Sequence, residues 1–185
     1  MNRGGFILLF ISLFLADCAF CQDVNQMPTM EEIAEGKSLA KNAEYFSLGL
    51  ENKYNENYDV AAEYFEKALE AFPEDHASMY ELSVLYMSKG LQEKGFEMIK
   101  KAVELDSTNK WYKIRLADFY KFNNEYESFI AIYDKLLEDD PNNLEYLEVY
   151  IEASLHLGNY EKVTEKLDVY EDNIGVNEYL SMQKI

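Results

Sequence analysis

Apolar residues recur along most of the chain at the three- and four-residue spacing of a helix that buries one face. In the clearest stretch, 60–69, six apolar side chains follow this spacing: Val60, Ala61, Tyr64, Phe65, Ala68 and Leu69. Polar segments such as 55–57 and 106–109 interrupt the pattern and are typical of turns. The pattern predicts helices over about 30–54, through 60–69, and over about 77–88, 92–105, 111–122, 125–138, 144–157 and 160–171.

Two signals mark the ends of the first predicted helices. Thr29 is followed three residues later by Glu32, and this pair is typical of a capping box, in which each side chain binds a backbone N–H of the other residue. We therefore expect the first helix to begin at about Met30, with a bend at Gly36. Pro73 ends the next helix, because proline lacks a backbone N–H and disfavours helical backbone in the residue before it.

The pattern repeats at a fixed step of 34 residues. One turn position recurs as Pro73, Ser107, Pro141 and Gly175. Two adjacent helical positions recur with the same step, the first mostly leucine and the second mostly small: Leu48, Leu82, Leu116 and Tyr150, beside Gly49, Ser83, Ala117 and Ile151. Such self-similarity is the signature of stacked helix-turn-helix units.

These positions resemble the tetratricopeptide repeat, a family of 34-residue helix pairs. The first unit matches the family pattern at Tyr45, Leu48, Gly49, Tyr58, Ala61, Phe65, Ala68 and Pro73. The resemblance implies an all-α fold, a right-handed superhelical solenoid of antiparallel helix pairs, within a helical domain over 29–177. The repeats that it implies cover 42–75, 76–109, 110–143 and 144–177.

The fourth repeat departs from the family pattern. Ile151, Val163 and Tyr170 stand where the family has small side chains. Because bulky side chains hold two helices apart, we expect this pair to be more widely separated than the first two pairs. In the first repeat, Ala61 is expected at the closest approach of the two helices.

The first residues have the features of an export signal. Asn2 and Arg3 precede an apolar run that is too short to span a bilayer, and small residues follow it. We interpret residues 1–21 as a signal peptide cleaved before Gln22, and residues 22–28 as a flexible spacer. An alternative is a lipid on Cys18, as in lipoprotein signals. Either reading predicts an exported protein, located in the periplasm or cell envelope or secreted.

The last residues contain a further apolar segment. Residues 178–185 have the pattern of another helix that is cut short. Two interpretations remain open here. The chain is the front part of a longer repeat array, or a short final helix packs on the fourth repeat and completes the fold.

Composition argues against several classes of function. The formal net charge is −18, which disfavours nucleic acid and anionic membrane surfaces as partners. His76 and His156 are 80 positions apart and no EF-hand spacing occurs, so no metal site or catalytic residue is predicted. Neither a phosphate-binding loop nor a nucleophile motif is present, and we expect no cofactor and no enzymatic activity.

The resemblance implies a concave groove lined by the first helix of each repeat. On that face the candidate binding residues are Phe46, Leu50, Tyr54, Tyr80, Val84, Met87, Trp111, Ile114, Asp118, Phe122, Glu148 and Glu152. Glu145 and His156 also fall on it. This face is apolar and aromatic at its front and acidic at its back. Trp111 is the best single anchor, although Trp111 and Phe46 each also fit a role in packing between repeats.

Some members of the family hold a partner's terminal carboxylate with lysine, asparagine and arginine in this groove. Here the corresponding face carries Phe46, Leu50, Val84, Ile114 and Asp118, so this clamp is missing and a carboxylate ligand is disfavoured. An amphipathic helix or extended segment with basic residues suits the face better.

Three functional hypotheses follow. The first is a non-catalytic scaffold of the cell envelope that binds a protein or peptide in the groove. The second is the helical front part of a longer envelope protein whose working domain, enzymatic or sugar-binding, lies beyond Ile185. The third is a lipid-anchored assembly factor, which would meet a membrane only through a lipid on Cys18.

Overall fold

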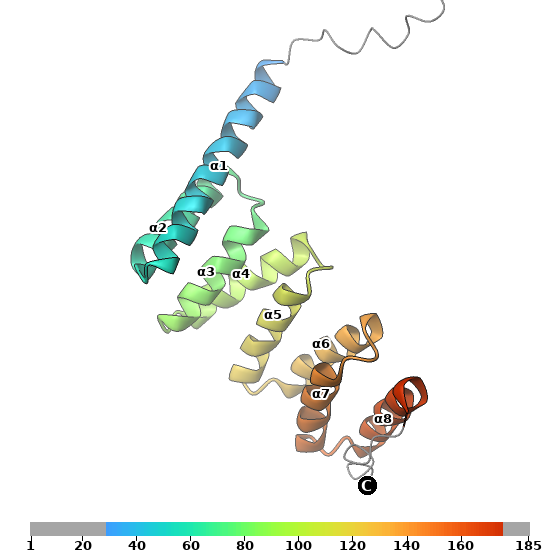
Figure 1. Cartoon of the computed structure of the whole chain (residues 1–185). Coiled ribbons are helices and arrows are strands. Elements are labelled where there is room, and N and C mark those ends of the chain that lie inside the picture. Colours follow the sequence, from blue (N-terminus) through green and yellow to red (C-terminus); the bar gives the residue numbers. More distant parts are fainter. Residues whose placement is uncertain (1–28, 176–185) are drawn as a thin grey trace, which may run out of the picture. The chain divides into compact units, whose positions relative to one another are not determined.

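The computed structural model describes residues 29–175, and these residues form eight α-helices without any strand. In chain order they are α1 (Met30–Tyr54), α2 (Tyr58–Ala71), α3 (His76–Ser88), α4 (Gln92–Leu105), α5 (Lys110–Phe122), α6 (Tyr126–Asp139), α7 (Leu144–His156) and α8 (Tyr160–Ile174) (Figure 1). The prediction of an all-α fold is confirmed. The helix boundaries agree with the predicted ranges to within a few residues.

Two compact units divide the chain between Ala40 and Lys41, within α1. The described part of the first unit is the N-terminal end of α1. The expected capping box is present there, because the Thr29 N–H donates to a Glu32 carboxylate oxygen at 2.5 Å and the Glu32 N–H donates to the Thr29 hydroxyl at 3.2 Å. The helix continues through Gly36 without interruption.

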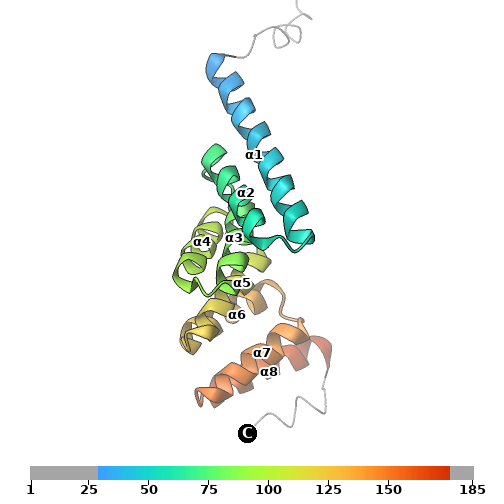
Figure 2. The ribbon, with the colours of Figure 1, turned by 90° about the vertical axis from the view of Figure 1, so that its left-hand side faces the viewer.

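The second unit contains the repeats. From α2 to α8, each helix packs against the next one in the chain, and Figures 1 and 2 show this succession of helix pairs. The apolar core follows the same succession in three clusters. They centre on Phe65 and Leu82, on Ile99 and Phe119, and on a larger group at the α6–α8 end that includes Leu147. Burial is therefore distributed along the array, as expected for a repeat protein.

Two glycines set the closest packing in the first repeats. A Cβ atom on Gly49 would lie 2.6 Å from the ring of Phe65, and one on Gly95 would lie 2.8 Å from the ring of Phe119 and 3.1 Å from the carbonyl oxygen of Ser83. Ala61, which is predicted at the closest approach of the two helices, is fully buried. The small residues at these positions are what allows the helices to approach.

The fourth repeat is packed differently. Ile151, Val163 and Tyr170 are all buried. Fewer backbone positions of α7 and α8 approach each other closely than in the pair α3 and α4. The wider separation expected from these bulky side chains agrees with this difference.

A side-chain network holds the first two repeats together. One carboxylate oxygen of Asp75 accepts the N–H groups of Ala77 and Ser78 and so caps α3. The other accepts the Ser78 hydroxyl at 2.5 Å and the Asn42 amide at 2.8 Å. Asn42 also donates to the carbonyl oxygen of Ala68 at 3.1 Å. One carboxylate therefore connects α1 and α3, and Asn42 extends the network to α2.

Some predictions lie outside the described residues. They are the signal peptide over 1–21, the spacer over 22–28, lipidation at Cys18 and the further helix over 178–185. Within the described range, no helix combines the length and the apolar character needed to cross a membrane.

Candidate protein-binding face

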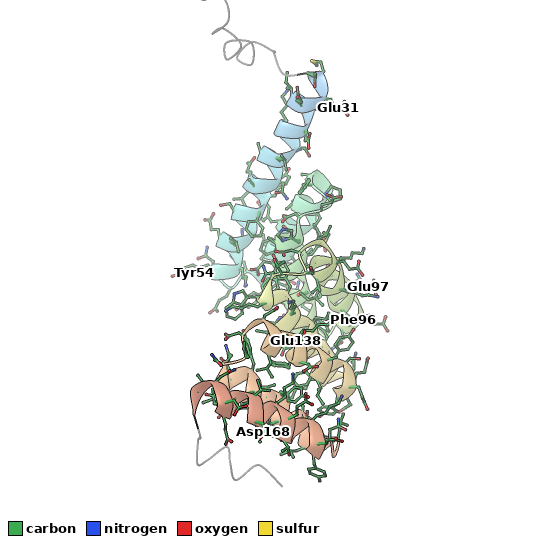
Figure 3. All side chains as sticks on the ribbon, turned by 90° about the vertical axis from the view of Figure 1, so that its right-hand side faces the viewer. Glu31, Tyr54, Phe96, Glu97, Glu138 and Asp168 are labelled. Atoms are coloured by element: carbon green, nitrogen blue, oxygen red, sulfur yellow. The ribbon has the colours of Figure 1, made fainter. Side chains whose placement is uncertain are left out.

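The candidate face is formed by the predicted groove residues on the first helices α1, α3, α5 and α7, and we refer to it as the first-helix face. Four of its large apolar side chains are exposed: Leu50 at 40%, Tyr54 at 90%, Trp111 at 60% and Phe122 at 56%. Figure 3 shows Tyr54 pointing away from the ribbon at the end of α1. Exposure of several large apolar residues at related helix positions is typical of an interaction surface.

Five other predicted groove residues are half-buried because neighbouring helices cover part of each: Phe46, Tyr80, Val84, Met87 and Ile114. The Phe46 ring lies 5.6 Å from the ring of Phe65, and the Tyr80 ring lies 5.3 Å from that of Tyr112. Met87 and Ile114 pack against core clusters. These residues join the core to the surface, so Phe46 serves packing more than contact.

Trp111 is placed by the end of its own helix. The side-chain oxygen of Asn109 accepts the backbone N–H of Trp111 at 3.0 Å and caps α5, which fixes Trp111 in the first turn. The ammonium group of Lys110 lies 5.2 Å from the centre of the indole ring. At 60% exposure, Trp111 belongs to the surface and not to the core.

Ion pairs neutralise two cations on this face. Lys53 of α1 pairs with Glu81 of α3 at 2.5 Å, and Arg115 pairs with Asp118 one helical turn away at 3.0 Å. Burial raises the pKa of the Asp118 carboxyl above its ordinary value, and the positive charges of Arg115 and Lys121 oppose this shift. The predicted site included Asp118 but missed its partner, although their spacing is one that brings helical side chains together.

The acidic part of the face lies on α7. Glu145, Glu148 and Glu152 are exposed and follow one another at spacings of three and four residues, which places them along one stripe of the helix. Within residues 29–175, no basic side chain forms an ion pair with any of the three.

A cavity of about 190 Å³ opens beside this stripe. It lies between α5, α6 and α7 and is lined by Lys121, Tyr126, Phe129, Val149, Glu152, Ala153 and His156. The ring of His156 meets that of Tyr126 edge-on at 4.6 Å, and the Lys121 ammonium lies 5.6 Å from the centre of the Phe129 ring. Of the residues predicted on the first-helix face, Glu152 and His156 line this cavity.

A wider cleft of about 600 Å³ lies at the turns, where Phe122 meets the turn between α3 and α4 at Gly90 and Leu91. The structure therefore does not gather the predicted residues in a single pocket. They are distributed along four helices, with the exposed aromatic side chains on α1 and α5 and the unpaired carboxylates on α7.

The two histidines have separate surroundings. His76 shares a hydrogen bond of 2.9 Å with the Tyr112 hydroxyl, and His156 lies at the cavity. In the described part of the chain, no three His, Cys, Asp or Glu side chains come together in a way that would hold a metal ion. The Asn143 side chain, in the loop before α7, caps that helix by accepting the Tyr146 N–H at 3.1 Å.

Sequence models of the tetratricopeptide repeat match residues 46–110 and residues 112–143. Together these ranges cover more than half of the chain. The chain therefore belongs to the tetratricopeptide repeat family. The matched ranges end before the fourth repeat, where the sequence departs from the family pattern.

This tetratricopeptide repeat protein is similar to a named relative and to several solved structures. Hsp70-Hsp90 organizing protein 2 of Arabidopsis thaliana is 27% identical in an alignment of 128 residues that covers 64% of this chain. The chain spans only 22% of the length of that protein.

Among solved structures, the MamA protein is 20% identical with a TM-score of 0.61, covering 71% of this chain and 72% of MamA. The first tetratricopeptide repeat domain of Spaghetti (RPAP3), bound to the HSP90 peptide SRMEEVD, is 19% identical with a TM-score of 0.58. That match covers 65% of this chain and 95% of the solved one. At these identities the structures support the fold alone.

Proposed function

We propose that this tetratricopeptide repeat protein is a non-catalytic scaffold that binds a protein or peptide segment on its first-helix face. The observation that carries the proposal is the exposure of Tyr54, Trp111 and Phe122 on the first helices of the first and third repeats. Large aromatic side chains of this kind form the energetic centres of protein interfaces.

The relatives support the class of partner. One is named as an organizing protein for Hsp70 and Hsp90, and another was solved with a peptide of HSP90. We therefore propose the same general role for this chain, that of a tetratricopeptide repeat array that binds another protein.

The peptide chemistry differs, however. SRMEEVD carries three acidic residues, and here Lys53 and Arg115 are already paired while the α7 carboxylates are not. We infer that this chain does not bind an acidic peptide of that type.

Export to the cell envelope is part of the proposal and rests on the sequence of residues 1–21. Mass spectrometry of the mature protein from its native host distinguishes the alternatives. A mature chain that begins at Gln22 supports a soluble exported scaffold, whereas a lipid on Cys18 supports a membrane-anchored form. Recovery of the uncleaved chain from the cytosol would contradict export.

Binding is tested by affinity capture with the full mature chain and matched variants. Trp111→Ala and Tyr54→Ala remove exposed side chains from the first-helix face, while Tyr160→Ala removes a side chain of similar exposure, 51%, from α8. We expect one or more proteins to be retained by the wild type and by Tyr160→Ala, and to be lost from both face variants. Equal capture by all four chains would place binding elsewhere and overturn the proposal.

The single tryptophan gives a second measurement. Because Trp111 is the only tryptophan of the chain, intrinsic fluorescence reports on this face. A captured partner, once purified, is expected to shift the emission of Trp111 on titration. An unchanged spectrum at saturating partner would mean that Trp111 is not part of the contact.

A further inference from the structure

The charges on the first-helix face indicate which kind of segment it accepts. Two cations on the first helices are held by carboxylates, Lys53 by Glu81 and Arg115 by Asp118. Lys110 and Lys121 lie over aromatic rings and form no ion pair among the described residues. An anionic group that binds Lys53 or Arg115 would have to break an ion pair, and such an exchange returns little net energy because a charge pair is lost for each one gained.

The carboxylates of α7, by contrast, form no ion pair among the described residues. Glu145, Glu148 and Glu152 form an exposed stripe along α7 and have no ion-pair partner in the part of the chain that the structure describes. The chain as a whole adds to this potential, since its net charge is −18. Charge complementarity therefore favours lysine or arginine in the segment that faces α7.

The cavity beside the stripe gives the second part of the recognition. Its volume of about 190 Å³ is below the range of typical small-molecule pockets, about 300–1,000 Å³, and suits one side chain. Tyr126, Phe129, Val149 and Ala153 supply an apolar and aromatic lining. The Lys121 ammonium group, the Glu152 carboxylate and the His156 ring also line the cavity. Its apolar and aromatic walls make it a good place for an apolar side chain.

We propose that the partner is a segment that inserts one apolar side chain into this cavity and places lysine or arginine residues against Glu145 and Glu148 of α7. This inference rests on the proposed function, since it names the chemistry of the segment that the first-helix face would bind. The basic residues lie on the Glu145 side of the apolar anchor, because the other side of the cavity is occupied by His156. Glu148 and Glu152 are one helical turn apart, roughly 6 Å along the axis. The nearest basic residue is therefore expected two to four positions from the anchor.

The test is a selection of random peptides displayed on phage against the full mature chain. Three variants separate the contributions. Glu145→Gln with Glu148→Gln removes two charges from the α7 stripe, and Val149→Trp fills the cavity. Glu97→Gln with Glu138→Gln removes two exposed charges from α4 and α6, the second helices of their repeats, and is the matched control (Figure 3).

Enriched peptides are expected to combine an aromatic or large aliphatic residue with nearby lysine or arginine. A synthetic copy of the most enriched peptide, titrated against each chain, is expected to bind at least about tenfold more weakly to the α7 charge variant and to Val149→Trp. Binding to the control variant is expected to remain unchanged. Circular dichroism of each variant shows whether Val149→Trp is folded, and the α7 charge variant provides an independent test if it is not.

The outcomes are distinct. The selection could enrich acidic or uncharged peptides whose binding is lost in Trp111→Ala. That result would leave the proposed function intact and overturn this inference. Equal weakening by the α7 and control variants would also overturn it, because it would show an effect of net charge alone. Failure to enrich any peptide above an unrelated surface would count against the proposed function itself, and the inference would fall with it.

Discussion

At the residue scale, Gly49 and Gly95 set how closely neighbouring helices approach each other. Each faces a buried phenylalanine ring at a separation that leaves no room for a methyl group. Phe65 is fully buried and lies against Phe46, so its ring has nowhere to move. The fourth repeat shows the converse, because Ile151 and Val163 occupy the positions equivalent to Gly49 and Ala61.

Replacement of these glycines tests the packing. Gly49→Ala is expected to lower the free energy of unfolding by about 1–3 kcal/mol, because the added methyl group meets the Phe65 ring. Gly36→Ala is the control, since nothing lies within 4 Å of the added atom there. It is expected to increase helix content without loss of stability. Urea denaturation followed by circular dichroism measures both, and equal stability of the two variants would contradict this account of the helix contact.

The same scale shows what the sequence reveals about the candidate site. Helix position places Trp111 and Phe122 on the candidate face, but it leaves open whether Trp111 is exposed or packs between repeats. The partial burial of Phe46 was left open, since it depends on the Phe65 ring of the next helix. The Lys53–Glu81 ion pair was missed because the partners are 28 residues apart and belong to different repeats. Helical periodicity identifies the face of each helix, but not which long side chains meet across repeats.

At the element scale, helix ends carry much of the information that made the fold predictable. Turn residues at a 34-residue step mark the ends of α2, α4, α6 and α8, and the predicted ranges of α2 to α8 agree with the structure to within a few residues. For the fourth repeat, side-chain volume alone predicts a wider separation of the two helices. The network around Asp75 was not predicted, because it joins Asn42 and Ser78 across the junction between two repeats.

The Asp75 network leads to a comparison of two caps. Asp75→Ala removes the cap of α3, leaves the buried Ser78 hydroxyl without its acceptor, and leaves the Asn42 amide with only the carbonyl oxygen of Ala68. We expect a loss of about 2–4 kcal/mol from the cap and the unsatisfied Ser78 donor together. Asn109→Ala removes a cap that accepts only the Trp111 N–H and is expected to cost about 1 kcal/mol. Equal losses in thermal denaturation would show that the network adds nothing beyond a cap.

The first turn of α1 provides a pH-dependent test. Hydrogen bonds from the backbone N–H and the side chain of Thr29 lower the pKa of Glu32. Because the folded pKa is lower than the unfolded one, this contact stabilises the helix end above the ordinary glutamate pKa of about 4.3. The stabilisation is lost as the pH falls from there through the lowered folded pKa.

Amide exchange in the first turn of α1 measures this loss and is expected to accelerate over that range. In Thr29→Ala the pKa of Glu32, followed by NMR titration, is expected to rise toward its ordinary value. Glu32→Gln keeps a hydrogen-bonding side chain without a titrating proton, so its helix end is expected to show no such pH dependence. An unchanged Glu32 pKa in Thr29→Ala would contradict the capping interaction.

At the scale of the whole molecule, the excess of negative charge outweighs the ion pairs. The chain has 35 acidic and only 17 basic residues. The five ion pairs among the described residues all lie at least partly at the surface. Exposed pairs contribute little to stability, and general self-repulsion opposes the folded state.

Salt is therefore expected to stabilise the protein. Raising sodium chloride from low concentration to about 0.5 M shortens the range of charge repulsion and is expected to raise the Tm by a few degrees. Differential scanning calorimetry at constant pH measures the shift. A lower Tm in salt would show that attractive pairs such as Lys53–Glu81 dominate the electrostatics instead.

The packing of α8 on α7 has a further consequence. One side of α7 carries the acidic stripe, while its other side supports the last described helix through residues such as Leu147 and Leu167. A ligand bound on the open side would restrain α7. Local opening of α8 away from α7 would then become less frequent. Ligand binding at α7 would therefore lower the deuterium uptake of α8, although the ligand does not contact α8.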